Sequence, residues 1–296
     1  MNQESISVII VTYNNGHQIR ACLSSLRQKP KPQQIFLIDN HSRDQTREQT
    51  QRFIRDNPTF PIQATWNNQN LGFAHGLNQG LKNAKSKFIL LLTPDAELLP
   101  GALQQLMDHM QINSDVAMTA PQLLTPSGAI QPSCRRFPTY KDLIFELTGL
   151  PRLLKSKIHS HWKMDDFDHK TVRKVDQPEA TCMFIRATSL EKVGLMDERF
   201  PIFFNDVDWC KRFQFNGLKI FFTPRAQAIH NQGTSVSFKR AAMIWKSHQG
   251  FYRYFQKHHP SAGQKVVNYC LGFFLIFTAL LRSLPILLNT KTKGDR

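Results

Sequence analysis

Short runs of apolar residues alternate with helical patterns along the first hundred residues. Continuous apolar runs are typical of buried parallel strands, whereas the spacing of Ile19, Cys22, Leu23 and Leu26 is typical of an amphipathic helix. The pattern predicts strands over residues 7–11, 35–38, 62–66 and 88–92. It predicts helices over residues 18–28, 43–56 and 74–84. Strands separated by helices predict an α/β fold with a mainly parallel central sheet flanked by helices.

The alternation weakens after residue 99. We expect a helix over 100–110, because proline favours the first turn of a helix. Residues 127–176 are rich in Pro, His and Lys, and we expect an irregular region with a mobile loop that faces the substrate. Further apolar runs predict strands over 181–186, 220–223 and 227–230. Helices are expected over 189–193 and 207–215.

The C-terminal region is strongly apolar from residue 266 to residue 288. Arg282 and Pro285 interrupt the run, which is then shorter than the roughly 20 residues that a spanning helix needs. A helix at the bilayer interface, a short or re-entrant membrane segment, and a helix packed on the core are all compatible with it. Neighbouring Lys and Arg favour the interfacial helix. We therefore divide the chain into residues 1–238, with a donor-binding half to about residue 99 and an acceptor-side half over 100–238, and a basic, apolar helical segment over 239–296.

Cysteine usage indicates the cellular compartment of the protein, and the distribution of charge indicates which partners it could bind. The five cysteines include no C-x-x-C pair, which indicates a reducing compartment. No signal sequence precedes the first predicted strand, so we expect a cytoplasmic protein. The formal net charge is +16, and no acidic residue lies between Asp208 and Asp295. Such a distribution indicates either a solvated exposed face or an anionic partner, which could be nucleic acid, an anionic membrane surface or an acceptor that carries a diphosphate.

Several nucleotide and hydrolase motifs are absent from the sequence. It contains no G-x-G-x-x-G after the first strand, which argues against a dinucleotide site, and no P-loop. The G-x-S-x-G turn of α/β-hydrolases is also missing. Acidic residues at the ends of predicted strands remain as the candidate chemistry, because ligands of parallel sheets bind beyond the carboxyl ends of the strands.

Two acidic positions follow predicted strands. Asp39 could accept hydrogen bonds from a base or a ribose hydroxyl; alternatively, Asp39 or Ser42 caps the next helix. Asp95 and Glu97 form a D-x-E sequence, and residues two apart in extended backbone face the same side. Their carboxylates suit Mg²⁺ or Mn²⁺, which would also bind a diphosphate, although a solvated turn is the simpler alternative.

Asp206 and Asp208 head the helix predicted over 207–215. A carboxylate there can stabilise the helix start, or it can deprotonate an acceptor hydroxyl if it lies in a partly closed site. His230 ends a predicted strand next to a glycine turn. It could be structural, or it could be a ligand near a metal or a diphosphate.

The order of these motifs is more specific than any one of them. Over roughly residues 5–255 the chain resembles the family 2 glycosyltransferases, and within them the rhamnosyltransferase-like bacterial enzymes. The resemblance is carried by Ser7-Val-Ile-Ile-Val-Thr-Tyr-Asn14, Ile38-Asp-Asn-His-Ser42, Asn70-Leu-Gly-Phe-Ala74, Asn78-Gln-Gly80, Leu91-Leu-Thr-Pro-Asp95, Met196-Asp-Glu-Arg-Phe200, Asn205-Asp-Val-Asp-Trp-Cys210 and Ile229-His-Asn-Gln-Gly-Thr-Ser235.

This resemblance implies a GT-A fold, an inverting mechanism and a divalent cation, Mg²⁺ or Mn²⁺. It implies Asp206 as the catalytic base, Asp95 as a residue that serves the metal and the ribose, and His230 as a residue near the metal and the diphosphate. With Glu97 from the D-x-E sequence, the predicted metal site comprises Asp95, Glu97 and His230. The substrate-binding residues that the resemblance implies are Thr12, Tyr13, Asn14, Asp39, Asn70, Gly72, Phe73, Asn78, Asp95, Asp208 and Trp209.

Two positions depart from the family pattern. Thr93 replaces the usual Asn, and Asn205 replaces the usual Glu before Asp206. Asn205 removes a like charge beside the proposed base, and we expect this to lower the pKa of Asp206.

The predicted function is transfer of a sugar from a nucleotide-diphosphate sugar to a hydroxyl, on a lipid-linked or polysaccharide precursor of a cell-surface glycan. We expect a peripheral protein on the inner face of the plasma membrane, with no nucleic-acid partner. The alternatives are a catalytically weak or silent sugar-nucleotide-binding relative, and a basic nucleic-acid-binding protein supported by charge alone.

Overall fold

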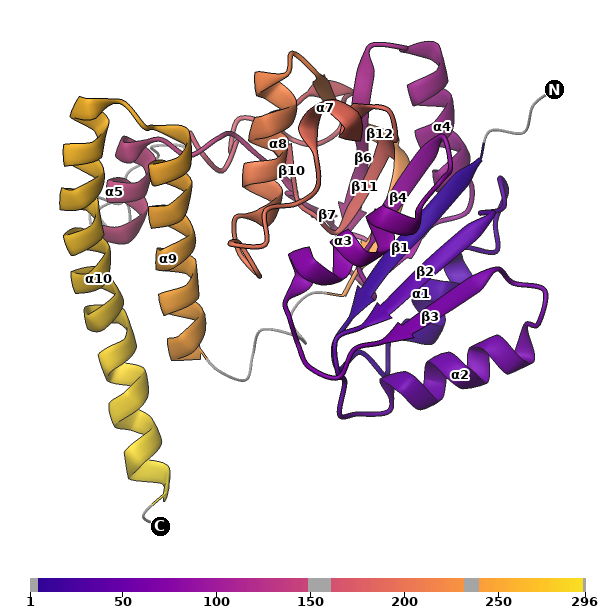
Figure 1. Ribbon diagram of the computed structural model, residues 1–296, viewed down its shortest axis with the longest axis horizontal. Coiled ribbons are helices and arrows are strands. Elements are labelled where there is room, and N and C mark those ends of the chain that lie inside the picture. The colour runs from indigo at the N-terminus through magenta and orange to yellow at the C-terminus, as the bar shows by residue number, and fades with distance from the viewer. Residues whose placement is uncertain (1–4, 149–160, 232–239, 295–296) are drawn as a thin grey trace.

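A twisted central sheet organises the protein (Figure 1). The computed structural model describes residues 5–148, 161–231 and 240–294. Among these residues the main sheet has ten strands, and its principal order is β3-β2-β1-β4-β11-β6-β12-β5. The strands along this order are β1 (Ile6–Thr12), β2 (Gln34–Asp39), β3 (Ile62–Trp66), β4 (Phe88–Leu92), β5 (Ala96–Leu98), β6 (Val116–Leu124), β11 (Cys182–Arg186) and β12 (Lys219–His230). The short strands are β7 (Ile130–Gln131) beside β6, β9 (Arg173–Lys174) beside β12, and the separate pair of β8 (Cys134–Arg135) and β10 (Gln177–Pro178).

Strand direction brings the candidate residues to one edge of the sheet. β1 pairs in parallel with β2 and β4, and β2 pairs in parallel with β3. β11 is antiparallel to both β4 and β6, and β12 is parallel to β6. The carboxyl ends of β1, β2, β3, β4, β6 and β12 therefore meet at the same edge, where β11 begins. We call it the carboxyl edge.

Helices cover both faces of the sheet. Alternate residues of β1 face opposite sides: Ile6, Val8 and Ile10 belong to one apolar cluster, and Ile9 and Val11 to another. The first cluster is covered by α1 (Ile19–Ser25), α2 (Thr46–Asp56) and α4 (Ala102–Ile112). The second is covered by α3 (Phe73–Asn83), α7 (Ser189–Val193) and α8 (Asn205–Phe215).

A helical hairpin stands beside the sheet domain (Figure 1). It consists of α9 (Arg240–His258) and α10 (Ala262–Gly294), with α5 (Tyr140–Thr148) packed against it. The ring of Phe251 in α9 lies 4.4 Å, centroid to centroid, from the ring of Phe204, directly before α8. The Tyr140 hydroxyl of α5 donates a hydrogen bond of 2.7 Å to Asn268 Oδ1 in α10. The hairpin therefore contacts the sheet domain at the start of α8.

The structure confirms the predicted α/β architecture, with the first four strands and three helices within a few residues of their expected positions. The nine-residue β6 was not predicted. Residues 127–176 contain β7, β8, α5 and β9 rather than only irregular chain, and part of the expected loop (149–160) lies outside the described residues. The two strands expected over 220–230 form the single strand β12, and α10 continues through Arg282 and Pro285. Pro100 lies outside α4, which follows Gly101 in a left-handed turn.

Candidate active site

The loops that follow β1 and β2 are joined by hydrogen bonds. Ser42 Oγ accepts a bond of 2.9 Å from the backbone N–H of Asn14, and Asn14 Oδ1 accepts one of 2.8 Å from Arg43 N–H. Thr12 is buried, and its hydroxyl lies 3.2 Å from Asn15 Oδ1. Tyr13 is the exposed member of this group, with 39% of its surface accessible. The predicted nucleotide residues therefore form a rigid surface with one free aromatic ring.

Asp39 ends β2 with a buried carboxylate. Its two oxygens accept bonds from the backbone and the hydroxyl of Ser42, which shape the turn after the strand. Neither Asp39 nor Ser42 caps α2, because Asp44 Oδ1 receives the Thr46 N–H at 3.0 Å instead. Asp39 thus remains at the carboxyl edge beside Asn14.

The segment before α3 is tied to the chain that leads into α8. Gly72 has a φ of +91°, and a Cβ there would lie 2.8 Å from the Cβ of Pro201. Phe73 N–H donates to the carbonyl of Pro201 at 2.8 Å. Asn78 is buried and bonds to both backbone groups of Met196, whereas Asn70 is exposed and holds Gly72 N–H through its side chain. The 196–201 segment is therefore positioned by contacts with Gly72, Phe73 and Asn78. These contacts do not involve a donor.

Asp95 and His230 meet at the carboxyl edge. Asp95 Oδ2 lies 3.6 Å from His230 Nε2, and both side chains are largely buried. The other ring nitrogen, His230 Nδ1, lies 3.0 Å from Gln131 Nε2 and 3.2 Å from Gln131 Oε1. Gln131 thereby orients the imidazole so that Nε2 faces the carboxylate.

The pKa values of this pair follow from their mutual contact. Burial alone would raise the pKa of Asp95, but hydrogen bonds from His230 and Thr93 lower it below the ordinary value. Burial alone would lower the pKa of His230, but Asp95 and the charge of Glu179 raise it. Thr93, the departure from the family pattern, thus still supports Asp95.

Glu97 does not join Asp95 and His230, which corrects the predicted set of three. Asp95 lies in a turn closed by the bond from Ala96 N–H to the Thr93 carbonyl, so the alternation of extended backbone does not apply to it. Glu97 lies in β5 and its Oε1 accepts a bond of 3.3 Å from Asn231 Nδ2. Across the described residues, no group of three or more His, Cys, Asp or Glu side chains is arranged to hold a metal ion.

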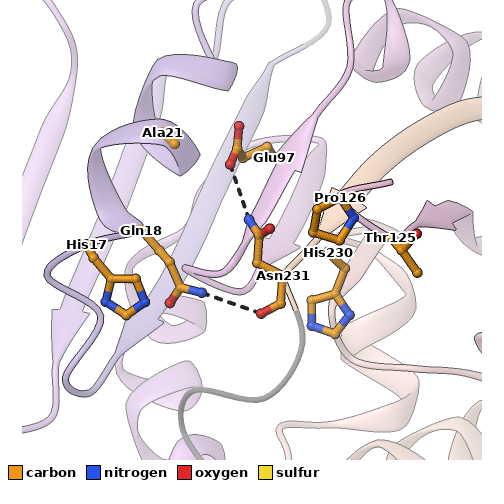
Figure 2. A pocket seen from close by; sticks show the side chains of 8 residues that line it. All are labelled: His17, Gln18, Ala21, Glu97, Thr125, Pro126, His230 and Asn231. Atoms are coloured by element: carbon orange, nitrogen blue, oxygen red, sulfur yellow. Dashed lines mark hydrogen bonds between the residues drawn. The ribbon is translucent and has the colours of Figure 1, made fainter. Parts of the chain in front are cut away.

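Glu97 instead lines a cavity of about 470 Å³ next to α1. Figure 2 shows the Asn231 side chain pointing to Glu97 and its backbone carbonyl pointing to Gln18, with His230 on the other side. The remaining lining residues are His17, Ala21, Thr125 and Pro126. The cavity thus shares only His230 and Glu97 with the predicted site.

The donor set of Asp95 and His230 fits a divalent cation. Carboxylate oxygen and imidazole nitrogen are both ligands of Mn²⁺, and Mg²⁺ is commonly bound by one or two carboxylates together with substrate phosphates. A pair of protein ligands therefore leaves coordination positions for a diphosphate. Asp95 and His230 are the residues that would hold the ion.

Asp206 lies at the start of α8 with its carboxylate turned toward β10. Gln177 Nε2 donates to its Oδ2 at 2.9 Å, and Val207 N–H donates to its Oδ1 at 2.8 Å. Burial raises the pKa of Asp206, although hydrogen bonds from Val207, Ala180 and Gln177 oppose the rise. Burial, rather than the missing charge at Asn205, therefore determines the direction of the pKa shift of Asp206. The side-chain amide of Asn205 accepts a hydrogen bond from the Asp206 N–H and donates one to the Ile202 carbonyl.

Comparison with known proteins agrees with this geometry. The family model described as "Glycosyl transferase family 2" matches residues 7–157, about half of the chain. The chain belongs to glycosyl transferase family 2. It is 22% identical over 269 residues to the N-acetylglucosaminyl-diphospho-decaprenol L-rhamnosyltransferase of Mycobacterium tuberculosis, a match that covers 86% of this chain and 85% of the relative. The resemblance to rhamnosyltransferase-like members of the family is confirmed.

Solved structures support the GT-A fold. The mannosyltransferase PcManGT of Pyrobaculum calidifontis, solved with GDP-Man and Mn²⁺, matches 98% of this chain and 80% of its own at a TM-score of 0.59 and 14% identity. GalNAc-T7, solved with UDP, GalNAc and Mn²⁺, matches 79% of this chain at a TM-score of 0.59 and 15% identity. This chain spans 45% of the GalNAc-T7 chain. The predicted GT-A fold is confirmed.

In this family 2 glycosyltransferase, one acidic residue of the site was missed by the sequence reasoning. Glu179 precedes β11, and its Oε2 accepts a bond of 3.3 Å from Gln131 Nε2, the same amide that orients His230. Burial raises the pKa of Glu179, and the charges of Asp206 and Asp95 add to the rise. Glu179 therefore lies beside the Asp95–His230 pair, to which Gln131 connects it. No strand was predicted before it, so the sequence offered no signal beyond its charge.

Asp208 and Trp209 are placed differently from the prediction. Both are fully buried. Asp208 bonds to Arg212 Nε at 3.0 Å, Lys257 Nζ at 2.6 Å and His258 Nε2 at 2.8 Å, and Trp209 Nε1 donates to the Gly194 carbonyl at 3.0 Å. These contacts give them roles in packing α8 rather than in contacting substrate, because residues two apart within one helical turn, such as Asp206 and Asp208, point to nearly opposite sides of the helix.

Proposed function

We propose that this glycosyltransferase inverts the anomeric centre of a nucleotide-diphosphate sugar and transfers the sugar to a hydroxyl of a lipid-linked or polysaccharide precursor in cell-surface glycan assembly. The observation that carries this proposal is the arrangement at the carboxyl edge. Gln177, which donates to Asp206, lies two residues from Glu179, and the Gln131 amide contacts both Glu179 and His230, the partner of Asp95. The proposed base, Asp206, and the pair proposed to lie beside the diphosphate, Asp95 and His230, thus face a common region.

The chemistry follows from these placements. Asp206 accepts the proton of the acceptor hydroxyl while that oxygen attacks the anomeric carbon and the bond to the diphosphate breaks. One displacement inverts the anomeric configuration. Asp95 and His230 would hold a divalent cation, which would supply charge neutralisation for the leaving diphosphate. The raised pKa of Asp206 makes it a stronger base than an ordinary aspartate, provided that it is ionised.

The donor half provides the nucleotide surface. The loops after β1 and β2 present Tyr13, Asn14 and Asp39 at the carboxyl edge, with Thr12 buried behind them. An exposed aromatic ring can stack on a base, and carboxylate and amide groups can accept or donate to ribose and base. The solved neighbours with UDP or GDP-Man and Mn²⁺ support a nucleotide sugar and a divalent cation as ligands of this half.

The helical hairpin suits an acceptor at a membrane. One helix of the described residues, Ala262–Leu284, is long and apolar enough to cross a membrane by length and composition. Its outward apolar residues, some of them adjacent in sequence, recur with each turn of the helix, and they are between 46% and 76% exposed. This apolar face of α10 comprises Val266, Val267, Tyr269, Phe273, Ile276, Phe277, Leu280, Leu281 and Leu284.

We place α10 on the membrane surface rather than across it. Leu271, Leu275 and Ala279 on its opposite side are buried against the rest of the protein. Contiguous exposed apolar patches mark interaction sites. A helix that is apolar on one face and flanked by cations lies at a lipid interface. Residues 239–296 would then hold residues 1–238 at the inner face of the plasma membrane. Charge beside apolar side chains favours an anionic membrane over nucleic acid as the partner.

The test is a donor screen with purified protein. UDP-, dTDP- and GDP-sugars are incubated with Mn²⁺, and both hydrolysis and the shift of the thermal unfolding temperature are measured. We expect one nucleotide class to stabilise the protein in a Mn²⁺-dependent manner and to be hydrolysed slowly. Asp206→Asn should still be stabilised by that donor while losing transfer. Asp56→Asn, an exposed aspartate on α2, is the matched control and should transfer at the wild-type rate.

A stabilising donor with wild-type transfer in Asp206→Asn would remove Asp206 as the base but leave the family assignment intact. Absence of stabilisation and hydrolysis with every donor would instead favour a catalytically silent relative.

A further inference from the structure

A second cavity lies away from the carboxyl edge, between α9 and the segment that leads into α8. Its volume is about 370 Å³. It is lined by Arg199, Phe200, Tyr252, Arg253, Gln256 and Lys257. Half of the lining side chains are cations, and no lining side chain is acidic. Neither the donor nor the base of the proposed reaction uses this cavity.

The cations around the cavity outnumber the carboxylates that pair with them. Asp197 Oδ2 lies 2.6 Å from Arg199 Nη2 and 2.7 Å from Lys257 Nζ. Asp208 pairs with Lys257 and, on its far side, with Arg212. Three permanent cations, Arg199, Lys257 and Arg212, therefore share two carboxylates, and a fourth cation lies beside them. Arg253 is this fourth cation, and its guanidinium donates to the backbone carbonyl of Arg199.

The helices beside the cavity add no compensating charge, and Glu198, directly before Arg199, is bonded to His75 and Asn78 instead. No acidic residue lies anywhere from residue 209 to residue 294, so neither α9 nor α10 supplies a carboxylate. The Arg199 side chain is 71% exposed, which keeps the site accessible from solvent. An excess of accessible arginine in a hollow with aromatic walls favours an anion, and the planar guanidinium fits phosphate oxygens in pairs.

The cavity adjoins the apolar face of α10. Tyr252, one of its walls, packs on α10 so closely that a Cβ at Gly272 would lie 3.0 Å from Tyr252 Cε2. Tyr269 and Ile276 lie three residues before and four residues after Gly272, which places them on the same side of the helix. An anion in the cavity would therefore lie beside side chains that we place in the lipid interface.

We propose that this cavity binds the phosphate group of an anionic membrane lipid, either the headgroup of an anionic phospholipid or the phosphate of a polyprenyl-linked acceptor. Cations next to an interfacial apolar helix are the arrangement that recognises anionic lipid headgroups. Phe200 of the cavity precedes Pro201, whose carbonyl holds Phe73, and the same segment continues into α8 and Asp206. Phosphate bound here would be held by the chain that positions the base.

This inference rests on the proposed docking of α10 at a membrane, and vesicle binding without any donor tests it apart from transfer. The full chain is mixed with vesicles of phosphatidylcholine alone, with phosphatidylglycerol added, or with a polyprenyl phosphate added. Bound protein is measured by co-sedimentation. Inorganic diphosphate serves as a soluble competitor.

The variants are Arg253→Gln and Arg199→Gln, with Lys246→Gln as the matched control. Lys246 is exposed on the same helix and lies outside the cavity, so its substitution makes the same change in net charge. Arg199→Gln alters a mostly exposed side chain, which keeps the test valid if Arg253→Gln unfolds. Thermal unfolding of each variant serves as the folding control.

We expect both cavity variants to bind vesicles that contain phosphatidylglycerol or polyprenyl phosphate, lipids with an uncompensated phosphate charge, about tenfold more weakly than Lys246→Gln, as loss of one charge-assisted contact predicts. On phosphatidylcholine alone the three variants should bind alike. A difference confined to phosphatidylglycerol or to polyprenyl phosphate identifies the source of the phosphate.

Equal binding of the three variants to every vesicle would overturn the phosphate site while leaving membrane docking in place. If inorganic diphosphate lowers the binding of the protein to vesicles while the cavity variants bind every vesicle like Lys246→Gln, the assignment of a lipid phosphate to the cavity is overturned. No binding of the wild-type chain to any vesicle would overturn both the phosphate site and the proposed docking of α10.

Discussion

The carboxyl edge of the sheet and the α9–α10 hairpin differ in the kind of side chain that each buries and exposes. At the edge, polar side chains are buried and bonded to one another, and the carboxylates of Asp95, Glu179 and Asp206 lie near a single region. In the hairpin, large apolar side chains are exposed and no carboxylate occurs. The first arrangement suits a charged ligand that needs fixed partners, and the second suits a lipid surface.

Helix α8 joins the two regions through aspartates two residues apart. Asp206 faces the edge, where burial raises its pKa. Asp208 faces the hairpin; burial alone would raise its pKa, but His258, Lys257 and Arg212 lower it. Identical side chains thus acquire opposite properties from the partners on each side of one helix. The comparison indicates that the reactive aspartate lies on the side of α8 that faces the carboxyl edge. The aspartate on the hairpin side stabilises the packing of α8 against the hairpin.

The largest expected effect is on catalysis at the edge. Asp206→Asn should reduce the transfer rate by about 10²- to 10⁴-fold, the usual contribution of a general base. Its unfolding temperature should be unchanged or higher, because the burial that raises the pKa of Asp206 disfavours its charged form, which the variant removes. Steady-state transfer and thermal unfolding measure the two properties. A large loss of stability would contradict the division of roles on α8.

The same base predicts a pH dependence of activity. Asp206 must be ionised, and its pKa lies above the ordinary value of about 3.9. The ratio kcat/KM should therefore fall as the pH drops through that raised pKa, at a pH above 4. A rate profile that stays flat down to about pH 4 would contradict the assignment.

The next effect concerns stability at the hairpin. Asp208→Asn leaves buried cations without their carboxylate, which typically costs about 3–5 kcal/mol of unfolding free energy. Because the folded pKa is lowered, the stabilisation is complete above the unfolded pKa of about 3.9 and is lost as the pH falls through the folded value. Denaturant unfolding between neutral pH and about pH 3 should show a shallower acid-side loss in the variant than in the wild type.

A smaller effect is expected at the apolar face. Phe273→Ser on α10 removes a large exposed side chain and should weaken binding to phosphatidylcholine vesicles about tenfold, since burying such a side chain contributes roughly 1.5–3 kcal/mol. Its unfolding free energy should stay within about 0.5 kcal/mol of the wild type. Ile112→Ser, at an exposed apolar residue of α4, is the matched control and should bind vesicles like the wild type.

The smallest effect is expected at Glu179. Glu179→Gln keeps an acceptor for Gln131 but removes a negative charge near Asp95 and His230. We expect a several-fold increase in the Mn²⁺ concentration that gives half-maximal transfer, with a smaller change in the rate at saturating Mn²⁺. A change in rate without a change in metal dependence would place Glu179 on the base side of the site instead.

Local patterns were sufficient for the elements whose burial is uniform. β1 and β4 are apolar throughout or nearly so, because helices cover both faces of the sheet there. β6 escaped prediction because its buried positions include Thr119, Pro121 and Gln122, which the sequence alone does not distinguish from a loop. Its strand structure depends on pairing with β11 and β12, and those partners lie far away in the chain.

The sequence by itself determined the α/β class, the family and the positions of Asp39, Asp95, Asp206 and His230, because each lies directly at the end of a local element. The tertiary structure alone decided which of them meet. Strand order brought His230 to Asp95 from 135 positions along the chain and left Glu97 with Asn231. Packing of α8 between the edge and the hairpin separated Asp206 from Asp208. These outcomes depend on contacts between distant segments, which no local pattern of residues encodes.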